Sequence, residues 1–203
     1  MLLHRKPSEE TVKQFISSQQ DLPFSYPQVG STQNQITNGP EGYIVDRNRI
    51  KLGEGEETYR RGVAALRSWQ QFELGWVTIV PPGKPLQTGT TVAVQAKVFG
   101  TWWLNAARIV YVVEEKVPEK ATFGFAYGTL PDHVERGEER FMVEWRADDS
   151  VWYDILAFSR PKHPLVRLCF PITRMLQKRF ARESLAVMLA AAARSGPEKP
   201  TVL

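Results

Sequence analysis

The sequence is poor in the residues that build metal centres and nucleophile sites. Its 203 residues include one cysteine, Cys169, and three histidines, His4, His133 and His163, which lie far apart. A single cysteine excludes an internal disulfide and a zinc site made of thiolates. Widely spaced histidines argue against a histidine metal centre. We therefore expect no metal and no other cofactor, and the scarcity of cysteine suits a reducing, cytoplasmic location.

Long apolar runs and the common nucleotide-binding or nucleophile motifs are missing as well. No stretch reaches the roughly 18 apolar residues of a membrane-spanning helix, and residues 1–6 have no apolar core of the kind found in signal peptides. The phosphate-binding loop GxxxxGK[ST], the dinucleotide motif GxGxxG and the nucleophile motif GxSxG do not occur. These absences favour a binding protein over an enzyme, although they leave enzymatic activity undecided.

The composition is that of an ordinary globular protein, with 42% apolar and 24% charged residues. This length suits one domain, which we place over residues 1–203. Residues 1–21 read as a helical extension in which Ser8 caps a helix that runs to about Gln20. Residues 196–203 read as a frayed tail. A second helix is predicted from Glu56 to Leu74, with Gly75 as its stop.

From Trp76 to Phe158 the hydrophobic period is two, which predicts strands joined by short turns in an antiparallel meander. Ile109, Tyr111 and Val113 are expected to share one face of a strand. A last helix is predicted from Pro164 to about Ser195, and Pro171 should either kink it or start its main part. Its apolar stripe, which should cover the sheet and bury Cys169, comprises Leu165, Leu168, Cys169, Ile172, Met175, Leu176 and Phe180. The fold class is therefore α+β, with a curved antiparallel sheet of about six to eight strands wrapped around a long C-terminal helix.

Several sequence blocks carry a family resemblance. The blocks are Phe24–Thr32, Gly53–Gly55, Trp69–Pro82, Trp103–Asn105, Arg108–Tyr111, Tyr127–Leu130, His133–Phe141 and Phe158–Pro161. Together they resemble uncharacterised protein family 0548, a domain of unknown function found in bacteria and plants. That family is similar to START-like proteins, so the resemblance implies a helix-grip fold that encloses a hydrophobic ligand cavity. No activity is established for the family, and the resemblance therefore supplies no catalytic residues.

Candidate ligand contacts come from the aromatic strands and from the junction before the last helix. Trp103 and Asn105 share a strand face, on which Asn105 would be a polar anchor beside an aromatic wall or, alternatively, the cap of a bulge. Arg160 could bind an acidic group, or pair with Glu138 or Asp154. Aromatic residues of this kind can equally be plain core. The candidate ligand-binding residues are Trp103, Asn105, Tyr111, Phe125, Tyr127 and Arg160.

Two further groups carry alternative functions. His133 and Glu138 could serve as acid and base in a cyclase-like or hydrolase-like enzyme, or belong to a solvated polar turn. Eight Lys or Arg and one acid lie between Arg160 and Arg194. A basic row on one helical face could contact an anionic membrane or another partner, or be a solvated surface; it comprises Arg167, Arg174, Lys178 and Arg182. Nucleic acid is not expected, because aromatic residues are not interleaved with these charges.

The reading that these observations favour is binding of an apolar or amphipathic small molecule between the sheet and the C-terminal helix. The alternatives are the acid–base enzyme and the membrane-binding or partner-binding module. The sequence does not specify the ligand or the oligomeric state.

Overall fold

The computed structural model describes residues 1–33, 39–117, 120–162 and 168–193. Within these residues an antiparallel sheet has the strand order β2-β8-β7-β6-β5-β4-β3, and the short strand β1 pairs with β5. The strands are β1 (Leu2–Leu3), β2 (Ile44–Glu54), β3 (Val77–Val80), β4 (Thr91–Val98), β5 (Thr101–Val117), β6 (Lys120–Thr129), β7 (Glu135–Trp145) and β8 (Ser150–Pro161). The helices are α1 (Glu9–Gln19), α2 (Gly55–Arg67) and α4 (Phe170–Ala193), with 3-10 turns η1 (Ser31–Gln33) and η2 (Gln70–Phe72).

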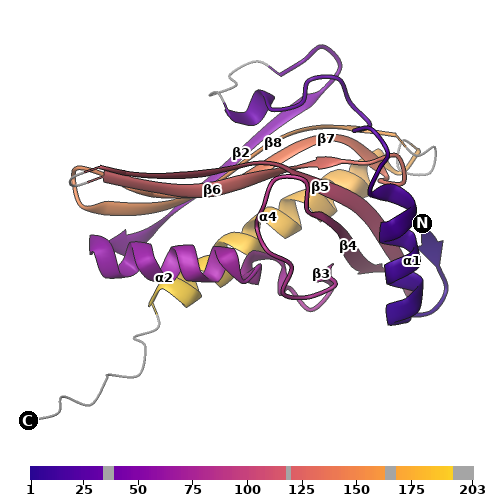
Figure 1. The fold of residues 1–203 in the computed structure, drawn as a ribbon, viewed down its shortest axis with the longest axis horizontal. Coiled ribbons are helices and arrows are strands. Elements are labelled where there is room, and N and C mark those ends of the chain that lie inside the picture. Colours follow the sequence, from indigo (N-terminus) through magenta and orange to yellow (C-terminus); the bar gives the residue numbers. More distant parts are fainter. Residues whose placement is uncertain (34–38, 118–119, 163–167, 194–203) are drawn as a thin grey trace, which may run out of the picture.

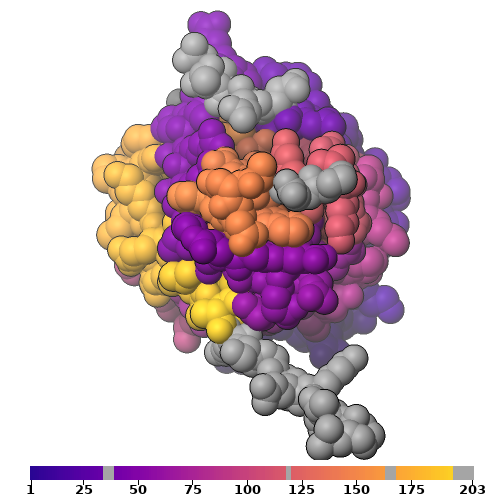
Figure 2. All heavy atoms as spheres, turned by 90° about the vertical axis from the view of Figure 1, so that its left-hand side faces the viewer, coloured from indigo at the N-terminus to yellow at the C-terminus, as the bar shows by residue number. Residues whose placement is uncertain are grey.

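The sheet curves over two helices that lie against its concave face (Figure 1). α4 runs diagonally beneath the sheet, and α2 lies beside the C-terminal end of α4. Figure 2 views that end, where α2 and the last turns of α4 meet below the turn between β7 and β8. There the Arg61 Nε donates to the carbonyl oxygen of Ala192 at 2.6 Å. The predicted curved antiparallel sheet gripping a long C-terminal helix is confirmed.

Aromatic side chains fill the middle of the space between the sheet and α4. Phe125 and Phe141 project from β6 and β7, while Trp69 and Phe72 reach in from the segment after α2. The ring centroids of Trp69 and Phe125 are 4.9 Å apart, and those of Phe72 and Phe180 of α4 are 5.2 Å apart. Such close offset and edge contacts stabilise the pairs beyond simple burial. This part of the interior is therefore a packed core.

The first two helices show how local chemistry sets helix ends. Ser8 caps α1 as predicted, because its hydroxyl accepts a hydrogen bond from the backbone N–H of Thr11 at 3.1 Å. The prediction that the second helix extends to Leu74 is wrong, since α2 ends at Arg67. Trp69 has a φ of +62°, which takes the chain out of the helix while its indole enters the core. The helical spacing of apolar residues thus continued past the end of the helix.

β5 contains an irregularity that reverses which side chains face inward. Its pairing with β6 shifts between Ile109 and Tyr111, so that Ile109 lies opposite Tyr127 and Val112 lies opposite Phe125. An extra residue in one strand changes the alternation by one position. Ile109 and Tyr111 therefore lie on opposite faces, and the prediction that they share one face is wrong.

Pro171 lies in the first turn of α4. A proline is tolerated there, because a backbone N–H at this position would have no partner within the helix. Of the two predicted roles for Pro171, the start of the helix is the one observed; residues 163–167 and 194–195 lie outside the described part. The prediction that the apolar stripe covers the sheet is wrong for the first turns, where Leu168 is 81%, Met175 54% and Ile172 39% exposed. The buried face consists of Ala181, Ser184, Met188 and Ala192.

The exposed start of α4 also corrects the expectation for its thiol. Cys169 is exposed and not buried. It precedes the first residue of α4, on which Gln177 rather than Met175 faces the sheet and donates to Glu135. In the described part of the chain, no helix is both long enough and apolar enough to cross a membrane.

Candidate functional site

A groove of about 790 Å³ lies between the N-terminal half of α4 and the adjacent end of the sheet. Its apolar lining comes from Trp76, Val98, Phe99, Pro171, Met175 and Leu176, and its charged lining from Lys97, Arg174, Lys178, Arg179 and Arg182. Every charged side chain that lines the groove is therefore a cation. An apolar wall beside several cations suits a molecule that has both an apolar body and an acidic group.

The five cations differ in how far acids already neutralise them. Arg174 forms a bidentate ion pair with Asp46 of β2, with N–O distances of 2.6 and 2.7 Å. Arg179 pairs with Glu183 at 2.7 Å and stacks on the Trp76 ring at 4.6 Å. Within the described residues, no acid forms an ion pair with Lys178 or Arg182. Lys97 likewise forms no ion pair there, but its ammonium lies over the Trp102 ring at 5.6 Å. Lys178 and Arg182 of α4 are accordingly well placed to meet an anionic ligand.

A pair of carboxyl groups lies on the concave face beneath the start of α4. The Tyr127 hydroxyl donates to Glu139 at 2.6 Å, and the Gln177 amide donates to Glu135 at 2.5 Å. The pKa of each carboxyl group is raised to about 7, mainly by burial, and the proximity of Glu135 contributes to the rise at Glu139. Arg174 donates to the Gln177 side chain at 2.6 Å, so hydrogen bonds connect this pair to the groove.

His133 and Glu138, the predicted acid–base candidates, do not lie together and do not line the groove. Glu138 is on the convex face, where its carboxylate accepts hydrogen bonds from the Tyr26 hydroxyl, the Gly30 N–H and both the N–H and hydroxyl of Thr32. His133 accepts a hydrogen bond at Nδ1 from the Glu135 N–H, and burial lowers its pKa to about 3. Glu138 therefore holds the chain around Tyr26–Thr32 in place, and its hydrogen bonds within the chain favour a structural role over the predicted acid–base role.

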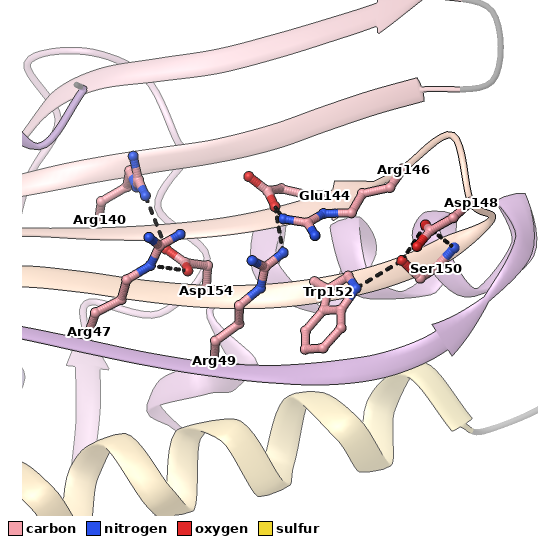
Figure 3. A network of polar contacts seen from close by, with 9 residues as sticks. All are labelled: Arg47, Arg49, Arg140, Glu144, Arg146, Asp148, Ser150, Trp152 and Asp154. Atoms are coloured by element: carbon pink, nitrogen blue, oxygen red, sulfur yellow. Dashed lines mark hydrogen bonds and ion pairs between the residues drawn. The ribbon is translucent and has the colours of Figure 1, made fainter. Parts of the chain in front are cut away.

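The convex face carries a network of arginines and acids across β2, β7 and β8 (Figure 3). Asp154 is fully buried and accepts from Arg140 at 3.0 Å and from Arg47 at 2.8 Å. Farther along the strands, Glu144 accepts from Arg49 at 2.9 Å. A buried carboxylate needs such partners, because an unpaired charge in the interior is costly. This network joins the outer strands of the sheet.

The bulge in β5 and the strand register decide where the predicted ligand contacts lie. Trp103, Phe125 and Tyr127 face the concave side, and Phe125 is plain core. Asn105 accepts from the Val134 N–H at 3.3 Å and is buried, which fits a structural anchor. Tyr111 lies on the convex face and exchanges a hydrogen bond with the Thr32 hydroxyl at 2.8 Å, so its predicted place in a cavity is wrong.

Arg160 is likewise on the convex face, where its guanidinium lies 4.6 Å from the centre of the Tyr43 ring. The predicted pairing of Arg160 with Glu138 or Asp154 is wrong, because other donors hold both carboxylates. From the predicted basic row, Arg174, Lys178 and Arg182 line the groove, and Arg167 lies outside the described residues.

Sequence reasoning missed the apolar wall of the groove, and it placed Glu135 and Glu139 beside a polar turn with His133 without assigning them to the concave face. Glu135 and Glu139 have the same strand parity as Phe141 and Val143, so alternation alone could have placed them on the inner face. Trp76 and Phe99 carried no comparable signal, because their place in the groove depends on how α4 lies against the end of the sheet.

Comparison with known proteins identifies the family. A family model described as "Domain of unknown function (DUF1990)" matches residues 25–187. A UPF0548 protein of Dictyostelium discoideum is 37% identical over 94% of this chain and 95% of its own length. A UPF0548 protein of Arabidopsis thaliana is 32% identical over 91% and 94%, respectively. A hypothetical protein from Helicobacter pylori has a similar fold, with a TM-score of 0.50, 13% identity and coverage of 84% of this chain and 96% of that one. The chain belongs to the DUF1990 (UPF0548) family, as its sequence blocks predicted.

Proposed function

We propose that this DUF1990 protein binds an amphipathic small molecule with an acidic head group in the groove beside α4. The observation that carries the proposal is the lining, which combines six apolar residues with five cations and no acid. The volume of about 790 Å³ falls within the range of roughly 300 to 1,000 Å³ that is usual for small-molecule sites.

The lining also indicates how such a molecule would lie. An apolar body would pack against Trp76, Val98 and Leu176, while the head group would meet Lys178 and Arg182, which form no ion pair with an acid in the described residues. Arg174 and Arg179 would contribute less attraction, because Asp46 and Glu183 already pair with them. A long-chain carboxylate has this combination of body and head group.

Calorimetric titration with sodium dodecanoate, kept below its micellar concentration, tests this arrangement. The double variant Lys178→Gln/Arg182→Gln should bind about fivefold more weakly, because two partly exposed charge contacts together contribute on the order of 1 kcal/mol. Arg60→Gln on α2 is the matched control and should bind like the wild type. Equal affinity for the double variant and the control would contradict the proposed head-group site, and absence of binding to the wild type would contradict the proposal itself.

A second candidate, docking on an anionic membrane, is favoured by one residue at the tip of the β4–β5 turn. Phe99 is 76% exposed and has a φ of +48°, followed by Gly100 at +78°. A turn with both central residues at positive φ strongly prefers Asn-Gly, so a phenylalanine there is strained and exposed at once. Met175 and the basic residues Lys97, Lys178 and Arg182 line the same groove as Phe99. An aromatic tip surrounded by cations suits a bilayer with negative headgroups.

Flotation with vesicles of phosphatidylcholine, with and without phosphatidylserine, tests the second candidate. Phe99→Asn removes the aromatic ring and relieves the backbone, and it should abolish flotation with phosphatidylserine vesicles while raising stability. Val29→Asn, which changes an exposed apolar residue outside the groove, should float like the wild type. Membrane docking is refuted if Phe99→Asn floats as well as Val29→Asn, or if the wild type does not float.

A further inference from the structure

Two arginines face each other on the convex side of the sheet. Arg136 of β7 and Arg160 of β8 are register partners in the antiparallel ladder. Both have the strand parity of Glu138 and Phe158, whose side chains contact Tyr26 on that side. Like charges directly opposite each other destabilise a strand pair. Their juxtaposition therefore calls for a compensating negative charge.

The acids near this pair are already used by other donors. Glu138 accepts hydrogen bonds from Tyr26, Gly30 and Thr32, and Asp154 accepts from Arg47 and Arg140. Among the described residues, neither Arg136 nor Arg160 forms an ion pair with an acid. The part of the chain that the structure describes thus supplies no acid as an ion-pair partner for these two guanidinium groups.

Two buried polar atoms on this face also have no hydrogen-bond partner among the described residues. They are the Arg136 Nε and the hydroxyl oxygen of Tyr43. The Tyr43 ring stacks against the Arg160 guanidinium with 4.6 Å between the ring centre and Cζ. Stacking fixes the plane of a guanidinium and leaves its N–H edge free to donate. Arg136 is the register partner of Arg160, and Arg160 lies against Tyr43, so donors from three side chains belong to neighbouring positions on this face.

We infer that Arg136, Arg160 and Tyr43 form a binding site for a phosphate group on the convex face. Two guanidinium groups can each give paired N–H hydrogen bonds to phosphate oxygens, and a phosphate dianion would remove the repulsion between the two cations. The Tyr43 hydroxyl adds a neutral donor beside them. The site lies on the opposite side of the sheet from the groove, so it does not depend on the function proposed above.

Titration with inorganic phosphate, followed by the arginine Nε–Hε signals in NMR spectra, tests the inference. The Arg136 signal should shift and saturate with half-saturation on the order of millimolar, whereas sodium chloride at matched ionic strength should not reproduce the shift. Arg136→Gln and Arg160→Gln should each weaken binding about tenfold or more, since each removes one of two bidentate contacts. Arg60→Gln should leave the affinity unchanged.

Three further results complete the test. Arg136→Lys keeps the charge but loses the paired N–H geometry, so it should bind phosphate more weakly than the wild type while folding normally. Glycerol 3-phosphate and vesicles that contain phosphatidic acid distinguish a soluble phosphate ester from a lipid headgroup. The inference is overturned if phosphate produces no saturable shift beyond that of chloride, or if Arg60→Gln weakens binding as much as Arg136→Gln.

Discussion

Replacement of Glu139 by glutamine should stabilise the protein, and by an amount that depends on pH. The Glu139 carboxyl lies on the concave face against the Tyr127 hydroxyl, and burial raises its pKa from the ordinary 4.5 to about 7. The folded state therefore holds more protons at this group than the unfolded state between these two pH values. The contribution of this group to stability must then fall as the pH rises from 4.5 through 7.

The size of the effect follows from the displacement of the pKa. At about 1.4 kcal/mol for each pH unit, a carboxyl group moved from 4.5 to about 7 destabilises the fold by about 3 kcal/mol once it is ionised. Glutamine cannot ionise, and its side-chain oxygen can still accept from Tyr127. Glu139→Gln should therefore match the wild type near pH 4.5 and exceed it by about 2 to 3 kcal/mol near pH 8.

Urea unfolding at a series of pH values, followed by tryptophan fluorescence, measures this difference. The exposed Glu115 provides the control, because Glu115→Gln should change stability little at any pH. A Glu139→Gln variant that is less stable than the wild type at pH 8, or whose stability difference does not change with pH, would refute the reasoning.

Three other substitutions test the structural account. Gly137→Ala should destabilise by more than about 3 kcal/mol or prevent folding, because a Cβ there would lie 1.9 Å from the carbonyl oxygen of Phe158; circular dichroism and urea unfolding measure this. Tyr26→Phe should cost about 1 to 3 kcal/mol in urea unfolding, because the buried Glu138 loses one of its donors. His133→Gln should be less stable than the wild type at pH 7.5, and this difference in unfolding free energy should shrink toward pH 5. Burial lowers the pKa of this histidine to about 3, so the wild type loses stability as the unfolded state takes up a proton below pH 6.5.

Strand alternation predicted the meander well, because each strand buries one face against a common core. It failed at Tyr111, where a bulge shifts the pattern by one residue, and single-sequence periodicity carries no sign of a bulge. Helical periodicity failed at Trp69, since an apolar residue in the turn that leads into η2 can fill the same space as one in a helix. The apolar stripe that includes Met175 was a real amphipathic pattern. The sequence did not indicate that the part of the stripe in the first turns of α4 is exposed to solvent.

Only the basic residues of the candidate site could be predicted from the sequence. The basic residues Arg174, Lys178 and Arg182 were visible as a row on one helical face, and the structure places them along the groove. The apolar wall was not predictable, because Trp76 and Phe99 come from separate segments that meet α4 only after the chain has folded. The ion pair of Arg174 with Asp46 likewise joins residues more than a hundred positions apart.

NMR titration of the wild-type protein with sodium dodecanoate tests the proposed groove most directly. The indole N–H of Trp76, which donates to Glu183 at 2.7 Å beside the groove, is a distinct reporter among the six tryptophans. The proposal predicts saturable shifts of this signal and of Phe99, Met175 and Lys178, with little change at Trp152 on the convex face. Shifts that do not saturate, or that cluster away from the groove, would contradict it.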